Sequence, residues 1–163
     1  MYIFVDCETG GLTPDYSLFA LGVIITDANF NELDRRELLF RLSEIHTTPQ
    51  ALIVNHIDVA QCGFNTDTFH DAVAFLYKYE KEKYIFAGWN VQFDMLFLDR
   101  YVPSHVRSHR MLDIQSVYRF MYPHQNANLI SASKSLGITL EPNHTAMRDI
   151  ECTLQIARVL KQK

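Results

Sequence analysis

The chain begins with the apolar run MYIFV (residues 1–5), and two carboxylates, Asp6 and Glu8, follow it directly. The run predicts a buried strand, in which side chains two residues apart point to the same face of the sheet. Two carboxylates on one face repel each other, so one of them would tend to keep its proton. A fold that contains this strand must therefore accommodate a concentrated negative charge at the strand's end.

The remaining pattern predicts further strands at first and then strands that alternate with helices. Strands are expected at 18–28, 32–42, 83–90 and 109–114, although the charged segment 32–42 would also suit a helix. Helices are expected at 48–57, 66–81, 114–121, 129–136 and 145–160. A further helix is expected after Asn90, its N-cap, and should end at Pro103. Gly137 should follow the end of the 129–136 helix. This order favours an α/β fold with a mixed sheet and helices on both faces. The turn after the first strand lacks the GxGxxG fingerprint of a parallel dinucleotide-binding fold.

Length and composition indicate an ordinary globular chain. Its 163 residues suit one domain over 1–163, and 48% hydrophobic with 21% charged residues is typical of such domains. No apolar run is long enough to span a bilayer and no signal peptide is recognisable, so no membrane association is expected. Cys7, Cys62 and Cys152 are scattered and odd in number, which favours a reducing cytoplasm over a disulfide framework or a zinc site. The net charge of −4 gives no basic footprint for duplex binding.

Three acidic positions lie where an apolar element ends or begins. Asp6 and Glu8 end the first strand, Asp94 in NVQFD lies in the first turn of a helix, and Asp149 in HTAMRD lies in the first turn of the last helix. Each alone has a plain explanation, because acidic residues complement the helix dipole and cap turns. A lone histidine such as His144 is likewise more often a surface or packing residue.

Taken together, these residues predict a metal site. Four carboxylates around one site require cations, and hard oxygen ligands select Mg²⁺ or Mn²⁺. Two such ions form the usual clamp for in-line attack on a phosphodiester. His144, five residues before Asp149, could accept the proton of the attacking water.

The motifs VDCETGGL, NVQFD and HTAMRD resemble the three motifs of the DEDDh 3′→5′ exonucleases, the DnaQ-like group of the RNase H-like superfamily. They occur in the family's order and cover nearly the whole chain. The segment TPQALIVNHID is similar to the RNase T and exonuclease X branch. The resemblance implies an RNase H-like sheet of five strands, with an antiparallel meander of the first three strands followed by parallel strands.

The resemblance also implies a role for each acidic residue. Asp6 would bridge two divalent cations, Glu8 and Asp149 would bind the cation that carries the catalytic water, and Asp94 would hold the second. His144 would be the general base beside the substrate.

The substrate-binding residues implied by the resemblance lie beside the first two motifs. Thr9 and Gly10 would contact the terminal sugar, and Leu12 would pack against a base. Asn90 and Phe93 would lie beside the scissile nucleotide, although Phe93 could equally be a core residue.

The sequence therefore predicts a metal-dependent 3′→5′ exonuclease that acts on the 3′ end of single-stranded DNA or RNA and releases nucleoside 5′-monophosphates. Two alternatives share the fold: a non-catalytic nucleic-acid-binding or proofreading module, and an RNase H-type endonuclease. The five intact functional positions disfavour the first. The Asp-x-Glu pair and the position of His144 disfavour the second.

Overall fold

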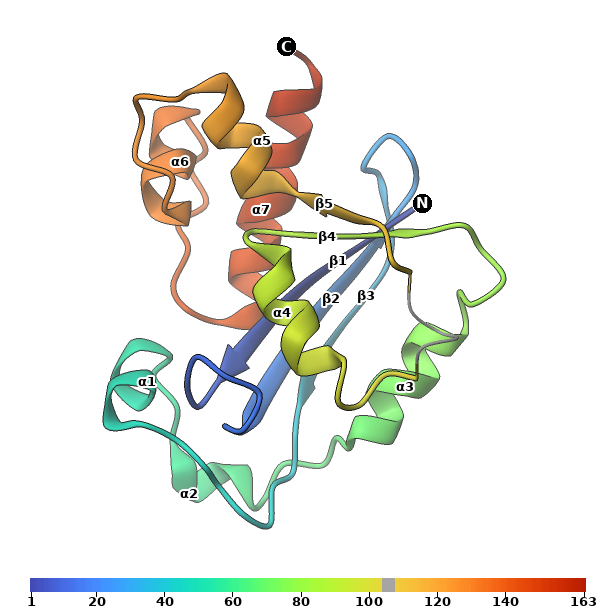
Figure 1. The fold of residues 1–163 in the computed structure, drawn as a ribbon, viewed down its shortest axis with the longest axis vertical. Coiled ribbons are helices and arrows are strands. Elements are labelled where there is room, and N and C mark those ends of the chain that lie inside the picture. The colour runs from blue at the N-terminus through green and yellow to red at the C-terminus, as the bar shows by residue number, and fades with distance from the viewer. Residues whose placement is uncertain (104–107) are drawn as a thin grey trace.

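The computed structural model describes residues 1–103 and 108–163 of the protein. Its centre is a five-stranded sheet in the order β3-β2-β1-β4-β5 (Figure 1). The strands are β1 (Tyr2–Thr9), β2 (Leu18–Thr26), β3 (Glu32–Leu39), β4 (Ile85–Gly88) and β5 (Met111–Asp113). β2 is antiparallel to both β1 and β3, whereas β4 is parallel to both β1 and β5. The predicted RNase H-like sheet, with a meander followed by parallel strands, is confirmed.

Helices cover both faces of this sheet, and each face has its own apolar core. The helices are α1 (Pro49–Val54), α2 (Val59–Cys62), α3 (Phe69–Tyr77), α4 (Val91–Leu98), α5 (Ile114–Met121), α6 (Leu129–Ser135) and α7 (Ala146–Lys161). One core contains side chains of α3 and α4, and the other contains side chains of α5, α6 and α7. β1 alternates between them, because Ile3 and Val5 belong to the first core and Phe4 to the second. Asp6 and Glu8 therefore share the strand face of Phe4, on the side of α7.

Strand β3 resolves the ambiguity left by its charged sequence. It pairs with β2 along its length, and its side chains are mostly exposed because it is an edge strand. Arg35 forms ion pairs of 2.5 Å with Glu32 and with Glu151 of α7, and the Tyr79 hydroxyl donates a hydrogen bond to Asp34. Charged side chains on an edge strand also discourage edge-to-edge association.

Helix boundaries differ from the prediction where caps intervene. The helix expected at 66–81 covers only Phe69–Tyr77. It begins at Phe69 because Thr68 and Asp71 form a capping box, and its C-cap is Lys78. The helix expected at 48–57 ends at Val54, and the short helix α2 was not predicted. Among the described residues, none of the helices combines the length and apolar character needed to cross a bilayer.

Two predicted helix caps have different outcomes. Gly137 adopts φ +71° just after α6, as expected for the residue beyond a helix end. Asn90 occupies the N-cap of α4, but its backbone is left-handed and its side chain makes no capping hydrogen bond. Its N–H instead donates to Asp113, which also caps α5.

Candidate active site

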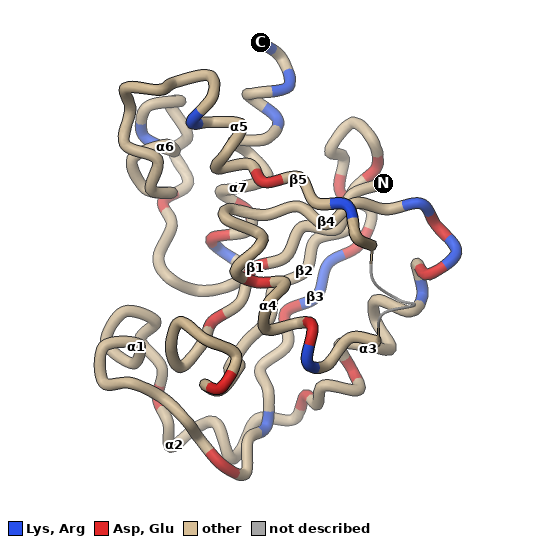
Figure 2. The backbone as a smooth tube through the Cα atoms, in the orientation of Figure 1, with Lys and Arg blue, Asp and Glu red and all other residues tan. Residues whose placement is uncertain are grey.

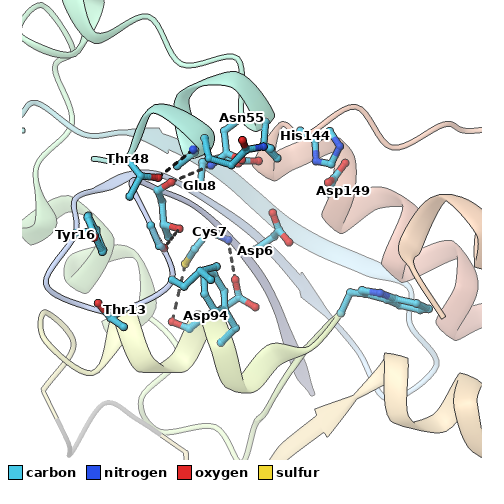
Figure 3. Close-up of a pocket in the computed structure, with 18 residues that line it drawn as sticks. Asp6, Cys7, Glu8, Thr13, Tyr16, Thr48, Asn55, Asp94, His144 and Asp149 are labelled. Atoms are coloured by element: carbon cyan, nitrogen blue, oxygen red, sulfur yellow. Dashed lines mark hydrogen bonds between the residues drawn. The ribbon is translucent and has the colours of Figure 1, made fainter. Parts of the chain in front are cut away.

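A cavity of about 740 Å³ opens beside the C-terminal end of β1. All five residues predicted to carry the chemistry line it: Asp6, Glu8, Asp94, His144 and Asp149 (Figure 3). They come from β1, α4, the loop before α7 and α7 itself. The fold thus brings together side chains that lie as much as 143 positions apart in the sequence.

Strand β1 presents the first two carboxylates, and a glycine on its neighbour lets α7 approach them. Asp6 pairs with Gly22 across the β1–β2 ladder. A Cβ at Gly22 would lie 2.9 Å from the backbone of Ala146, the first residue of α7. The start of α7, with Asp149 in its first turn, therefore packs directly on the strand beside Asp6.

Asp94 reaches the same cavity from the other core. It lies in the first turn of α4 and is buried, with 3% of its surface exposed. The backbone N–H of Cys7 donates a 2.8 Å hydrogen bond to Asp94 Oδ1. Because Cys7 stands between Asp6 and Glu8, this bond fixes the Asp94 carboxylate beside the end of β1 (Figure 3).

Asp149 organises the loop that carries His144. The Asn143 N–H donates a 3.0 Å hydrogen bond to Asp149 Oδ1. His144 itself has a left-handed backbone, with φ +58°, and its side chain is exposed. The imidazole therefore stands at the solvent-accessible rim of the cavity, next to the Asp149 carboxylate (Figure 3).

The cavity is strongly acidic. Burial, with a contribution from the charge of Asp149, raises the pKa of Asp6 to about 8. Burial and the charges of Asp6, Asp149 and Glu37 raise the pKa of Glu8 to about 9. Burial and the Asp6 charge raise the pKa of Asp94, and burial raises that of Asp149 against the opposing hydrogen bond from Asn143.

Among the described residues that line the cavity there is no lysine or arginine to compensate these charges (Figure 2 shows the basic residues elsewhere on the backbone). Divalent cations would supply the missing positive charge, and the donor set of hard carboxylate oxygens fits Mg²⁺ or Mn²⁺. No three His, Cys, Asp or Glu side chains within residues 1–103 and 108–163 already form a metal-binding group. The carboxylates share one cavity without being a preassembled metal centre.

The predicted substrate-binding residues divide into two groups. Thr9, Leu12 and Phe93 line the cavity. Phe93 also packs against the α3–α4 core, and its place beside the scissile nucleotide stays a prediction. Gly10 and Asn90 are not among the lining residues. A Cβ at Gly10 would lie 2.3 Å from the His46 carbonyl oxygen, so this glycine permits a close backbone contact behind the cavity wall.

Ten lining residues were not predicted. They are Cys7, Gly11, Thr13, Tyr16, Thr48, Gln50, Ala51, Val54, Asn55 and Trp89. Helix α1 contributes several of them because its ends bind the turn after β1: Thr48 N–H donates to the Gly10 carbonyl oxygen, and Asn55 Nδ2 donates to that of Thr9. These residues of α1 belong to the segment TPQALIVNHID, which is similar to the RNase T and exonuclease X branch. The sequence alone does not show which residues of this segment face the cavity.

The close contact at Gly22 leads to a prediction about the position of Asp149. Gly22→Ala should force the start of α7 away from β2, because the new methyl group would overlap the Ala146 backbone. We expect a loss of about 1–3 kcal/mol in the free energy of unfolding, the usual cost of overpacking, together with reduced activity. Gly63→Ala is the matched control, since a Cβ there meets nothing within 4 Å. Denaturant melts and kinetics of both variants would test this. Equal free energies of unfolding and equal rates for the two variants would show that α7 does not pack against Gly22 as closely as described.

The meander followed by parallel strands, with carboxylates at the end of the central strand, defines the class as RNase H-like α/β proteins. Residues 3–157 match the family RNase_T, described as exonuclease. The chain therefore belongs to the DEDDh exonuclease family.

Several solved structures share the fold. An exonuclease I structure superposes with a TM-score of 0.86 at 21% identity, over 99% of this chain and 41% of the other. Exonuclease I from Methylocaldum szegediense superposes with a TM-score of 0.85 at 17% identity, over 99% of this chain and 40% of the other. A zinc-bound complex of E. coli exonuclease I with single-stranded DNA superposes with a TM-score of 0.83 at 19% identity, over 99% of this chain and 40% of the other. The chain thus spans about two-fifths of the length of these proteins. No curated protein sequence matches it significantly.

Proposed function

We propose that this protein is a metal-dependent 3′→5′ exonuclease that releases nucleoside 5′-monophosphates from single-stranded nucleic acid. The observation that carries the proposal is the convergence of four carboxylates and one histidine on a single open cavity, with no lysine or arginine among its described lining residues. A non-catalytic binding module would have no need to bury mutually repelling carboxylates, which cost folding free energy.

The residues would divide the chemistry as follows. Asp6, Glu8, Asp94 and Asp149 would hold two divalent cations, Mg²⁺ or Mn²⁺. When bound, the cations would acidify the attacking water and neutralise the charge that develops on the leaving oxygen. The His144 imidazole, at the exposed rim beside Asp149, would accept the proton of the water. Thr9 and Leu12 would position the terminal nucleotide so that its phosphodiester lies over the carboxylates.

Single-stranded DNA is the substrate that we favour. Exonuclease I structures with the same fold were determined in complex with dT13 and dA16 oligonucleotides. The net charge of −4 and the acidic cavity favour a site that holds only a few nucleotides of a flexible end. RNA is the alternative, because a few contacts to the terminal sugar decide between the two.

The test uses 5′-labelled single-stranded DNA and RNA of the same sequence, with Mg²⁺ or Mn²⁺ and with EDTA. We expect a ladder that shortens from the 3′ end, faster for DNA, and no products in EDTA because the carboxylates would lack their cations. A control oligonucleotide with a blocked 3′ end should resist degradation. One internal cut would indicate an endonuclease, and no cleavage with either metal would refute the proposal.

A further inference from the structure

Trp89 is the single tryptophan of the chain, and it lines the candidate active site. It follows directly after Gly88, the last residue of β4, and precedes α4, which carries Asp94. The indole is partly buried. The proposed chemistry of the carboxylates and His144 does not require it.

Aromatic neighbours hold the indole in place. The ring of Trp89 lies 5.9 Å from that of Tyr118, and Tyr118 lies 5.1 Å from Tyr122, measured between ring centroids. Tyr118 is fully buried, and its hydroxyl is hydrogen-bonded to Ser135 of α6. A ring supported in this way loses little conformational freedom when a ligand stacks on it.

Packing alone does not explain the indole. Its Nε1–H is buried and has no hydrogen-bond partner among the described residues. An unpaired buried donor is unfavourable, and a phenylalanine could pack against Tyr118 without it. Compared with a phenylalanine ring, the indole gives the cavity wall a larger π surface, and this is what it supplies beyond packing.

The cavity has apolar surface from two separate segments. Leu12 comes from the turn after β1, and Ala51 and Val54 come from α1. On the other side, Trp89 lies in the β4–α4 connection and Phe93 lies in the first turn of α4. The phosphodiester that is cleaved has a nucleotide on each side, and each nucleotide has one base. Two apolar surfaces are therefore what a site for the last two nucleotides of a strand requires.

We infer that Trp89 is a stacking platform for one of the two bases that flank the scissile phosphate. The inference rests on the proposed exonuclease function and deepens it. Every base has a π face, so recognition by stacking tolerates any sequence. The loss of one base–aromatic stack lowers affinity by about 5- to 150-fold.

The single tryptophan gives a direct readout of this contact. The Asp6→Asn variant, which should bind without cleaving, is mixed with ten-nucleotide single-stranded DNA while the tryptophan fluorescence is followed, and binding is measured separately by anisotropy of a labelled oligonucleotide. We expect strong quenching on binding. An abasic site at one of the last two positions should abolish the quenching, whereas an abasic site at the fifth position from the 3′ end should preserve it. Quenching that is absent despite binding, or that is unchanged by both terminal abasic sites, would overturn the inference.

Kinetics with the active enzyme provide the second test. Trp89→Leu should raise KM by about 5- to 150-fold, with kcat affected less, and Trp89→Phe should restore most of the affinity. Phe120→Leu is the control, because Phe120 is 88% exposed and does not line the cavity. A KM for Trp89→Leu equal to that of the parent would refute the inference. If the parent enzyme does not shorten DNA from its 3′ end, the proposed function itself fails. If Trp89→Leu does not fold, the fluorescence experiment alone decides.

Discussion

Asp6→Asn should abolish nuclease activity while it raises the thermal stability of the metal-free protein. Activity should fall by at least about 10³-fold, because the Asp6 carboxylate acts on two of the others, raising the pKa of Glu8 and of Asp94, and a cation held among them would lose one of its ligands. An asparagine keeps the size of the side chain and removes the negative charge that a cation would need.

The gain in stability follows from the direction of the pKa shifts. The pKa of Asp6 rises from 3.8 to about 8 on folding, so the folded state retains a proton that the unfolded chain releases. Below pH 4 the carboxyl group is protonated in both states and its burial has no charge penalty. The free energy of unfolding then falls as the pH rises toward 8. Glu8, whose pKa is raised to about 9, lowers it further up to about pH 9 for the same reason. Asp6→Asn removes the Asp6 part of this penalty, at least about 2 kcal/mol at pH 9, which corresponds to roughly 4–8 °C in Tm.

Thermal melts at pH 5 and pH 9, with EDTA and with excess Mg²⁺, would measure the effect. The difference between Asp6→Asn and the parent protein should be largest at pH 9 in EDTA and should shrink with Mg²⁺, since cations offset the repulsion in the parent. Glu44→Gln is the control, because Glu44 is exposed and does not line the cavity. Activity retained by Asp6→Asn would refute the site assignment, whereas a lower Tm at pH 9 would refute only the electrostatic argument.

The elements that the sequence predicted well are those in which a local pattern determines the outcome. In β1, the period of two residues put Ile3 and Val5 in one core and Asp6 and Glu8 on the other face. In α7, Ile150, Leu154 and Ala157 lie at helical spacing, and all three are buried on one face of the helix predicted at 145–160. The four carboxylates could be predicted because each lies at a recognisable element boundary.

Predictions failed where the outcome depends on contacts between distant segments. Thr48 and Asn55 line the cavity because their polar groups bind the turn after β1, about 40 residues earlier in the chain. No local period in the sequence reports such a contact. Gly10 shows another contact of this kind, because the His46 carbonyl oxygen packs against it; its predicted contact with the terminal sugar stays a prediction.

Helix ends were misjudged for a related reason. A run of apolar residues at helical spacing predicted a helix from 66 to 81, but the Thr68–Asp71 capping box begins it later. Capping depends on a few specific hydrogen bonds, whereas periodicity averages over the whole segment. This explains why the presence of an element is easier to predict than its boundaries.

His144→Asn should lower kcat by about 10²- to 10⁴-fold, the usual contribution of a general base, while cation binding remains close to that of the parent protein. The loop should keep its shape, because Asp149 accepts a hydrogen bond from the Asn143 N–H, which the substitution does not remove. Asparagine is preferable to alanine here, since His144 has φ +58° and asparagine tolerates this left-handed conformation better.

Single-turnover kinetics over a range of pH and calorimetric titration with Mn²⁺ would separate the two roles that a histidine can have at such a site. If His144 accepts the proton of the water, the variant should lose kcat and keep its Mn²⁺ affinity. If His144 instead serves mainly to hold Asp149 in place, kcat and Mn²⁺ affinity should fall together. His124→Asn, an exposed position outside the cavity, should change neither quantity. Because the imidazole stands at the open rim and Asp149 is tethered by the backbone, the geometry favours the first outcome.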